Sequence, residues 1–213
     1  GILPCLRGRR IRAVEVREPR LRWPVPPDLD AILRGEEVDT VERRGKYLLV
    51  RLGKGTLLIH LGMSGSLRVL TAPAATPRKH DHIDLLLEDG QLLRYHDPRR
   101  FGAFLWLEGD PAEHPLLAEL GPEPLGTGFD GLYLFRLSRG RRTSVKQFLM
   151  DGHVVVGVGN IYKFEIRGAA DKAALKIDPV LDQVDAAQQA HPQFFVGEFG
   201  DASKVDAVVT AYE

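Results

Sequence analysis

The sequence predicts an α+β protein in which antiparallel strands come first and short helices follow. Between residues 11 and 107, strand-like runs follow one another with little helix between them. This order favours an antiparallel sandwich or barrel. After Trp106, the pattern changes to short helical runs separated by segments rich in proline and glycine.

The predicted strands are alternating or β-branched and aromatic runs bounded by turn residues. They are residues 11–17, a pair between 38 and 50, and 56–61, 66–70, 83–87, 91–95 and 103–107. A short helix at 28–33 interrupts them, with Asp28 as its cap and Gly35 as its stop. Asp89 and Gly90 predict a two-residue hairpin turn between 83–87 and 91–95.

Helices are predicted at residues 114–120, 132–137 and 144–150, with a linker rich in proline and glycine from 121 to about 130. A basic cluster, residues 139–142, separates the last two. Residues 154–162 contain Gly157 and Gly159 and predict a turn that opens a further helix. Backbone N–H groups at such a turn suit a phosphate, although the pattern by itself is weak.

The composition is that of a globular protein, with 213 residues of which 44% are hydrophobic and 27% charged. No run approaches the roughly 20 apolar residues of a membrane span, and no signal peptide is visible. The single cysteine, Cys5, excludes an internal disulfide and a zinc site made only of cysteines. We therefore expect a cytoplasmic protein with no membrane partner.

The net charge of zero conceals a division along the chain. Residues 1–163 hold 25 lysines and arginines against 20 aspartates and glutamates, whereas residues 164–213 hold 4 against 9. Such asymmetry indicates two segments of different character, of which the basic one is the candidate for binding a polyanion.

The stretch from Tyr95 to Gly102 lies between two predicted strands and contains Arg99, Arg100 and Phe101. Its proline fixes one backbone angle and its glycine permits a tight exit. One interpretation is a solvated turn with the phenylalanine tucked underneath. The other is a wedge, with arginines on phosphates and an apolar ring pushed into a stack of bases. The position alone does not choose between them.

Histidines do not predict a metal site. His80 and His82 flank Asp81 on alternating faces of a strand, so joint metal binding is not expected. His60 is interpreted as a histidine of a strand rather than a ligand.

Six motifs stand in one order over about 160 residues: 43–49, 60–65, 79–82, 97–102, 120–125 and 156–162. Together they resemble bacterial formamidopyrimidine-DNA glycosylase over residues 1–163. The resemblance implies a β-sandwich domain at 1–110 with its first residues missing, and a partial helix–two-turn–helix DNA-binding domain at 111–165. An unrelated acidic tail then occupies 166–213.

The resemblance also implies a function in DNA base-excision repair. The family removes oxidised purines, chiefly 8-oxoguanine and formamidopyrimidines, and cleaves the strand at the resulting abasic site. The implied partner is double-stranded DNA that contains oxidised purines or abasic sites. A monomer associated with the bacterial nucleoid is expected.

Site residues follow from the matching motif positions. Met63, Arg99 and Phe101 match a wedge that fills the gap left by a flipped-out base. His80, Arg99, Arg141 and Asn160 match positions that contact DNA. Lys46 matches a catalytic lysine beside the lesion, where a positive donor can assist proton transfer.

The sequence also departs from the family. Family members begin with proline, whose amine is the nucleophile, followed by glutamate. Here Gly1 to Pro4 align about a dozen residues further inside, so we expect impaired catalysis in the chain as written. The four-cysteine zinc ribbon is absent, and no cofactor is expected.

The end of the chain also differs from the glycosylase family. Residues 175–213 weakly resemble an extracytoplasmic segment of large bacterial lipid-exporting membrane transporters, which suggests a junction near 165. Three alternatives remain: an enzyme body, a non-catalytic binder of damaged or abasic DNA, and a non-functional chimeric reading frame.

Overall fold

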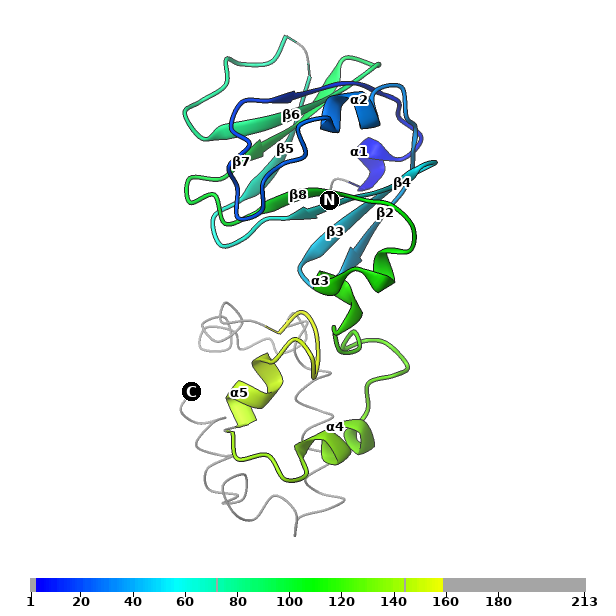
Figure 1. Ribbon diagram of the computed structural model, residues 1–213, viewed down its shortest axis with the longest axis vertical. Helices are drawn as coiled ribbons and strands as arrows, with labels where there is room; N and C mark the ends of the chain where they lie inside the picture. Colours follow the sequence, from blue (N-terminus) through cyan, green and yellow to red (C-terminus); the bar gives the residue numbers. More distant parts are fainter. Residues whose placement is uncertain (1–2, 72, 144, 159–213) are drawn as a thin grey trace, which may run out of the picture. The chain divides into compact units, whose positions relative to one another are not determined.

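The computed structural model describes residues 3–71, 73–143 and 145–158 (Figure 1). The chain divides into two compact units between Ala118 and Glu119. Each unit is described by itself.

The first unit consists of two four-stranded antiparallel sheets (Figure 1). The first sheet has the order β1 (Ile11–Val16), β6 (Asp81–Leu87), β7 (Gln91–His96), β5 (Ser66–Thr71). The second sheet has the order β2 (Val38–Arg44), β3 (Tyr47–Leu52), β4 (Gly55–His60), β8 (Ala103–Leu107). All the predicted strands are confirmed to within two residues, and two separate sheets make the unit a sandwich rather than a barrel.

The core of the first unit is formed by apolar residues from both sheets. Ile59 from β4, Ile83 from β6, and Tyr95 from β7 have no exposed surface. The Tyr95 ring packs 4.9 Å from that of Phe104 on β8, measured between centroids. Burial of each such side chain stabilises the fold by about 2 kcal/mol. The sandwich therefore provides a rigid base for the turns at its ends.

Short helices and one hairpin differ in detail from the sequence-based expectation. The β6–β7 loop has three residues, Glu88–Gly90, instead of two, and the φ of Gly90 is +85°. This is the three-residue hairpin in which a glycine in the left-handed region follows a tight turn. The helix predicted at 114–120 is shortened to α3 (Pro115–Ala118), and a 3-10 helix that we did not predict, η1 (Pro111–Glu113), precedes it.

Two further helices complete the first unit. The predicted helix at 28–33 is α2 (Leu29–Leu33), and Asp28 is its N-cap residue. The Asp28 side chain makes no capping hydrogen bond. A helix that we did not predict, α1 (Leu3–Leu6), precedes β1.

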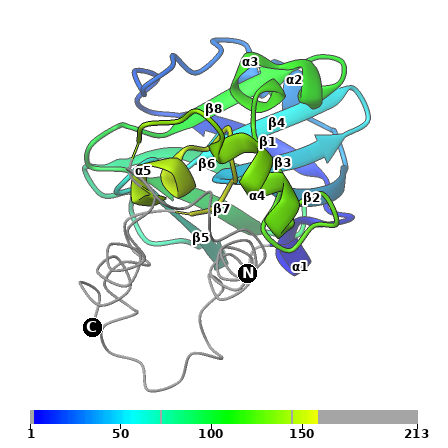
Figure 2. The same ribbon diagram turned by 90° about the horizontal axis from the view of Figure 1, so that it is seen from below.

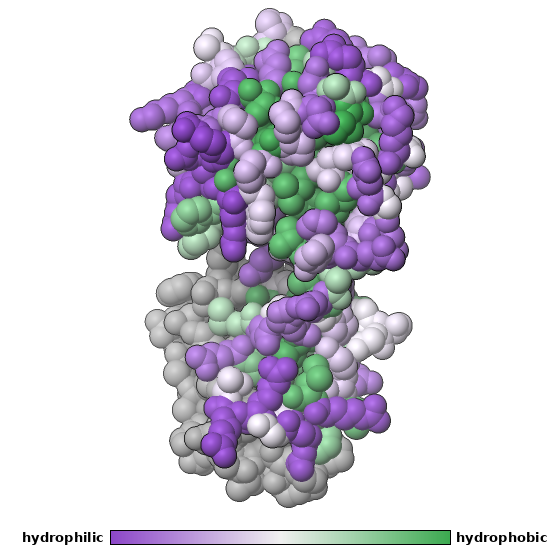
Figure 3. Space-filling model, in the orientation of Figure 1, coloured by the Kyte–Doolittle hydropathy of each residue, from purple (hydrophilic) through white to green (hydrophobic). Residues whose placement is uncertain are grey.

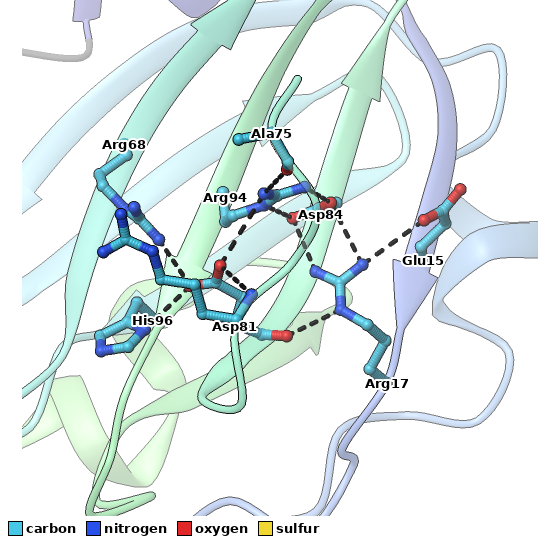
Figure 4. A network of polar contacts seen from close by, with 9 residues as sticks. Glu15, Arg17, Arg68, Ala75, Asp81, Asp84, Arg94 and His96 are labelled. Atoms are coloured by element: carbon cyan, nitrogen blue, oxygen red, sulfur yellow. Dashed lines mark hydrogen bonds and ion pairs between the residues drawn. The ribbon is translucent and has the colours of Figure 1, made fainter. Parts of the chain in front are cut away.

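The first sheet carries an ionic network on the face opposite the core (Figure 4). In register across its four strands stand Glu15, Asp84, Arg94 and Arg68. Arg94 and Asp84 are both buried, and the guanidinium donates two hydrogen bonds, of 2.8 and 2.7 Å, to the carboxylate. Arg17 donates a further bond to Asp84, of 3.1 Å. A buried charge pair of this kind is retained only with such full hydrogen bonding.

The same network holds the loop that precedes β6. Arg94 donates to the carbonyl of Ala75, at 2.6 Å, and the backbone N–H of Arg78 donates to Asp81, at 2.8 Å. Asp81 also accepts from Arg68 and contacts His96. The loop that leads to His80 is therefore tied to the sheet at Ala75 and at Arg78.

The second unit contains α4 (Gly131–Ser138) and α5 (Val145–Met150) (Figure 2). These confirm the helices predicted at 132–137 and 144–150. Asp130 caps α4 through a 2.7 Å bond from the backbone N–H of Tyr133. A small core packs between the helices and the following chain, and its buried members are Phe129, Leu134, Phe148, Leu149, Val154 and Val155. The partial helix–two-turn–helix domain stays a prediction, because residues 159–165 lie outside the described part.

Hydrophilic side chains cover much of the face of the described chain that Figure 3 presents, with hydrophobic ones between them. Among the described helices, none is long and apolar enough to cross a membrane.

Candidate nucleic-acid interface

The arginine turn, residues 97–102 between β7 and β8, is built around the fully buried Asp97. Its carboxylate accepts hydrogen bonds from Ser64 Oγ (2.6 Å), Tyr95 Oη (2.8 Å), and the backbone N–H groups of Gly102 (3.0 Å) and Arg99 (3.3 Å). Burial alone would raise the pKa of this carboxyl, but these bonds outweigh it and hold the pKa below its ordinary value. The turn is therefore locked by a buried anion.

The methionine turn, residues 61–65 between β4 and β5, packs backbone to backbone on the arginine turn. Gly62 has a φ of +63°, and a Cβ added there would lie 2.6 Å from the carbonyl carbon of Phe101. A Cβ on Gly102 would lie 2.5 Å from the carbonyl oxygen of His60 and would clash with the hydroxyl of Tyr95. Only glycine fits at both positions, and so the two turns form one surface.

Large apolar side chains project from this surface. Met63 is 75% exposed and Phe101 is 42% exposed. The Arg99 guanidinium lies 4.6 Å from the centroid of the Phe101 ring, a cation–π arrangement. The phenylalanine is thus not tucked beneath its turn. The structure brings together all three residues that the sequence predicted for the wedge.

Arg100 has a φ of +57°, the left-handed region, and no other non-glycine residue of the described chain has a positive φ. Its guanidinium pairs with Glu18 at 3.2 Å. This backbone conformation costs free energy and persists only where surrounding contacts impose it. Here this conformation reverses the chain direction between Arg99 and Phe101, the two exposed wedge residues on either side of Arg100.

Lys46 lies exposed at the two-residue turn between β2 and β3, next to Tyr47. The Tyr47 ring packs 5.0 Å from the ring of His60 at the end of β4. Burial lowers the pKa of His60, and the charges of Arg22 and Lys46 lower it further. Lys46 is therefore near the strand end that carries the methionine turn. Its catalytic role stays a prediction.

His80 is half-buried and lies against two other histidines. Its ring centroid is 6.2 Å from that of His82 and 5.9 Å from that of His96, both edge-on. The prediction that His80 and His82 lie on alternating faces is therefore wrong, because residues two apart in an extended chain point to the same side. Its carbonyl accepts a 3.0 Å hydrogen bond from the backbone N–H of Asp97. His80 thus lies beside the arginine turn. Within the described residues, no group of three or more histidine, cysteine, aspartate and glutamate side chains could hold a metal ion.

Arg141 lies in the second unit, just after α4. Its guanidinium donates to the carbonyl of Leu137 (3.2 Å) and to Asp151 (3.4 Å), and it lies 5.3 Å from the Phe148 ring. Asn160, the other predicted DNA contact of this region, lies outside the described residues. So does the tail from 166 to 213, and its transporter resemblance stays a prediction.

Sequence reasoning missed two contributors to this surface. Ser64 contributes a hydroxyl to the buried Asp97. Arg22 donates its backbone N–H to the carbonyl of Gly102, at 3.2 Å. The high arginine content of residues 7–22 indicates that this segment could contribute to a DNA-binding surface. It does not indicate that Arg22 is the residue that bonds to the arginine turn.

The two turns thus present an apolar ring, a methionine and an arginine from the end of a β-sandwich. Residues 1–104 match the family model described as formamidopyrimidine-DNA glycosylase N-terminal domain. The sandwich of the first unit is therefore similar to that domain family over residues 1–104. The predicted family resemblance is confirmed for this part of the chain.

Curated relatives extend the similarity beyond the N-terminal domain. The formamidopyrimidine-DNA glycosylase of Thioalkalivibrio sulfidiphilus is 63% identical over 165 residues, which cover 78% of this chain and 60% of the relative. That of Stutzerimonas stutzeri is 61% identical over 170 residues, 80% of this chain and 62% of the relative. The chain therefore spans about 60% of the length of these relatives.

Solved structures of formamidopyrimidine-DNA glycosylases are similar to this chain in fold. The Lactococcus lactis glycosylase, bound non-covalently to DNA with an abasic site, matches with a TM-score of 0.69 and 32% identity. The match covers 78% of this chain and 62% of the other. The Thermus thermophilus protein matches with a TM-score of 0.64 and 36% identity, over 77% of this chain and 59% of the other.

Proposed function

We propose that this chain is the lesion-recognising body of a DNA base-excision repair glycosylase that also cleaves abasic sites. The observation that carries the proposal is the pair of exposed apolar side chains, Met63 and Phe101, with Arg99 on one rigid surface. The N-terminal-domain match and the relatives' names support it. The proposed partner is duplex DNA that contains oxidised purines or an abasic site.

The geometry suits a wedge that acts only where a base has left the helix. Extrusion of a base costs a few kcal/mol of stacking and pairing. Met63 and Phe101 can fill the vacated space, and the guanidinium of Arg99 can reach the facing base or a phosphate. Because Asp97 and two glycines lock the turns, little conformational entropy is lost when they enter the helix.

Lys46 is proposed to act at the lesion. An exposed ammonium on a tight hairpin can donate a hydrogen bond to a phosphate or to a leaving oxygen. His80, Arg99 and Arg141 are proposed to contact the DNA backbone. A cofactor-free protein, a monomeric state and a cytoplasmic location stay predictions.

Phe101→Ala is expected to reduce the preference for an abasic duplex over an intact duplex roughly tenfold, which corresponds to about 1–2 kcal/mol. The ring acts only at the gap, so affinity for intact duplex should change little. Because the ring is 42% exposed, the loss of folding stability should be about 1 kcal/mol, not the 3–5 kcal/mol of a core phenylalanine. Fluorescence anisotropy on the two duplexes, with thermal unfolding, measures all three quantities.

Val16→Ala is the matched control, because Val16 is an exposed apolar residue of the same unit, at 36%, on β1. It should leave both affinities unchanged. An unchanged lesion preference in Phe101→Ala, with a large drop in melting temperature, would reject the wedge. Incision of an 8-oxoguanine duplex tests the catalytic part, and lesion-specific binding without incision would favour the non-catalytic binder.

A further inference from the structure

Arg22 is an exposed arginine attached to the arginine turn through its backbone. Its N–H donates to the carbonyl of Gly102, at 3.2 Å, immediately beyond Phe101. Its guanidinium carbon lies 4.7 Å from the ring centroid of Trp23, a stacked arrangement. Stacking on an aromatic face leaves the edge of the guanidinium, with its N–H donors, available to another group.

The side chain of Arg22 is without a carboxylate partner among the described residues. Its neighbours differ in this respect. Arg20 lies 2.8 Å from Glu18, and Arg100 lies 3.2 Å from the same carboxylate. Of these three arginines, only Arg22 has no carboxylate at ion-pair distance, whereas Arg20 and Arg100 share the single carboxylate of Glu18.

Charges around Arg22 reinforce this imbalance. The strand end at His60 meets Gly102 through its carbonyl, and β4 pairs with β8 through His60 and Ala103. The charges of Arg22 and Lys46 both lower the pKa of His60, and the carboxylate of Asp97 opposes them. That carboxylate is buried and engaged by its own turn. The surface is therefore positive where it adjoins the wedge, which favours an anion.

We propose that Arg22, oriented by its stacking on Trp23, binds a DNA backbone phosphate beside the displaced base. The inference rests on the proposed function, because the wedge places the DNA strand at this turn. A phosphate suits the planar fork of a guanidinium, which offers two parallel N–H donors. A base edge suits the position less well, because Phe101 and Met63 already project toward the bases.

The test is a salt titration of Arg22→Gln and wild type on a duplex with a tetrahydrofuran abasic site. Loss of one phosphate contact should lower the slope of log affinity against log salt by about 0.9. The deficit of the variant should accordingly shrink by about 3.5-fold between 50 and 200 mM salt. Arg22→Lys should keep the slope but bind more weakly than wild type, since it lacks the fork.

Arg20→Gln is the matched control, because it removes the same charge from the same loop at an arginine that is paired with a carboxylate, that of Glu18. It should keep the wild-type slope. Equal slopes for wild type and Arg22→Gln, or an equal loss in Arg20→Gln, would overturn the inference. Thermal unfolding of each variant separates loss of binding from loss of fold.

A measurement without DNA separates this inference from the proposed function. Titration with inorganic phosphate, followed by NMR, should shift the Trp23 indole and His60 ring signals in wild type but much less in Arg22→Gln. If wild type does not prefer the abasic duplex but shows these shifts, the proposed function fails and the anion site stands. If wild type binds the duplex and Arg22→Gln shows the same phosphate shifts, the inference about Arg22 fails alone.

Discussion

Asp97→Ala is expected to lower the free energy of unfolding of the first unit by about 4 kcal/mol, because it leaves buried donors without an acceptor. The hydroxyl of Tyr95 and the N–H of Gly102 both reach the carboxylate in the buried interior. Each unsatisfied buried group costs about 1–3 kcal/mol. The arginine turn should open, and lesion preference should be lost with it.

Urea unfolding measures this loss, and two variants serve as controls. Asp28→Ala removes an exposed aspartate whose side chain makes no capping bond, so its cost should stay within about 0.5 kcal/mol. Asp97→Asn keeps one acceptor and should cost about half as much as alanine. An Asp97→Ala protein as stable as Asp28→Ala would contradict the role assigned to the buried carboxylate.

The pH dependence provides a further check on the same group. Hydrogen bonds hold the folded pKa of Asp97 below its ordinary value. Its stabilisation is therefore complete above the unfolded pKa of about 3.9 and is lost as pH falls through the lower folded pKa. Between pH 6 and 2.5, wild type should lose more stability than Asp97→Asn, which has no carboxyl to protonate. Parallel pH profiles for the two proteins would be inconsistent with this.

Arg94→Met is expected to destabilise the protein by about 3–5 kcal/mol, because it leaves Asp84 charged and buried in the first sheet. Burial alone would raise the pKa of Asp84, but bonds from Arg94 and Arg17 hold it below the ordinary value. Arg17 remains as a partner in the variant but is itself partly exposed. The change also releases the carbonyl of Ala75 (Figure 4).

A double-mutant cycle with Asp84→Leu separates the pair from its surroundings. The double variant should be less destabilised than the two single variants added together, because no unpaired charge stays buried at the pair. Arg10→Gln, which breaks an exposed pair with Glu37, should cost less than about 1 kcal/mol. Additive costs in the cycle would show that Arg94 and Asp84 do not act together.

Much of the sandwich could be predicted because its signals are local. Residues 56–61 and 103–107 are apolar runs with turn residues at their ends, and both are strands in the structure. The wedge residues also came from short motifs. The predicted length of the β6–β7 loop was wrong by one residue. An aspartate–glycine pair suits both a two-residue turn and a longer loop with glycine in the left-handed region.

Contacts between distant segments could not be predicted in this way. The sequence by itself determined the strands, the turns between them and the residues at their tips, because backbone preferences depend on a few neighbours. Only the tertiary structure decided that the methionine turn packs on the arginine turn, that Arg22 joins Gly102, and that Arg94 is buried against Asp84. These contacts depend on strand order and register, which are set when two whole sheets bury their apolar faces together.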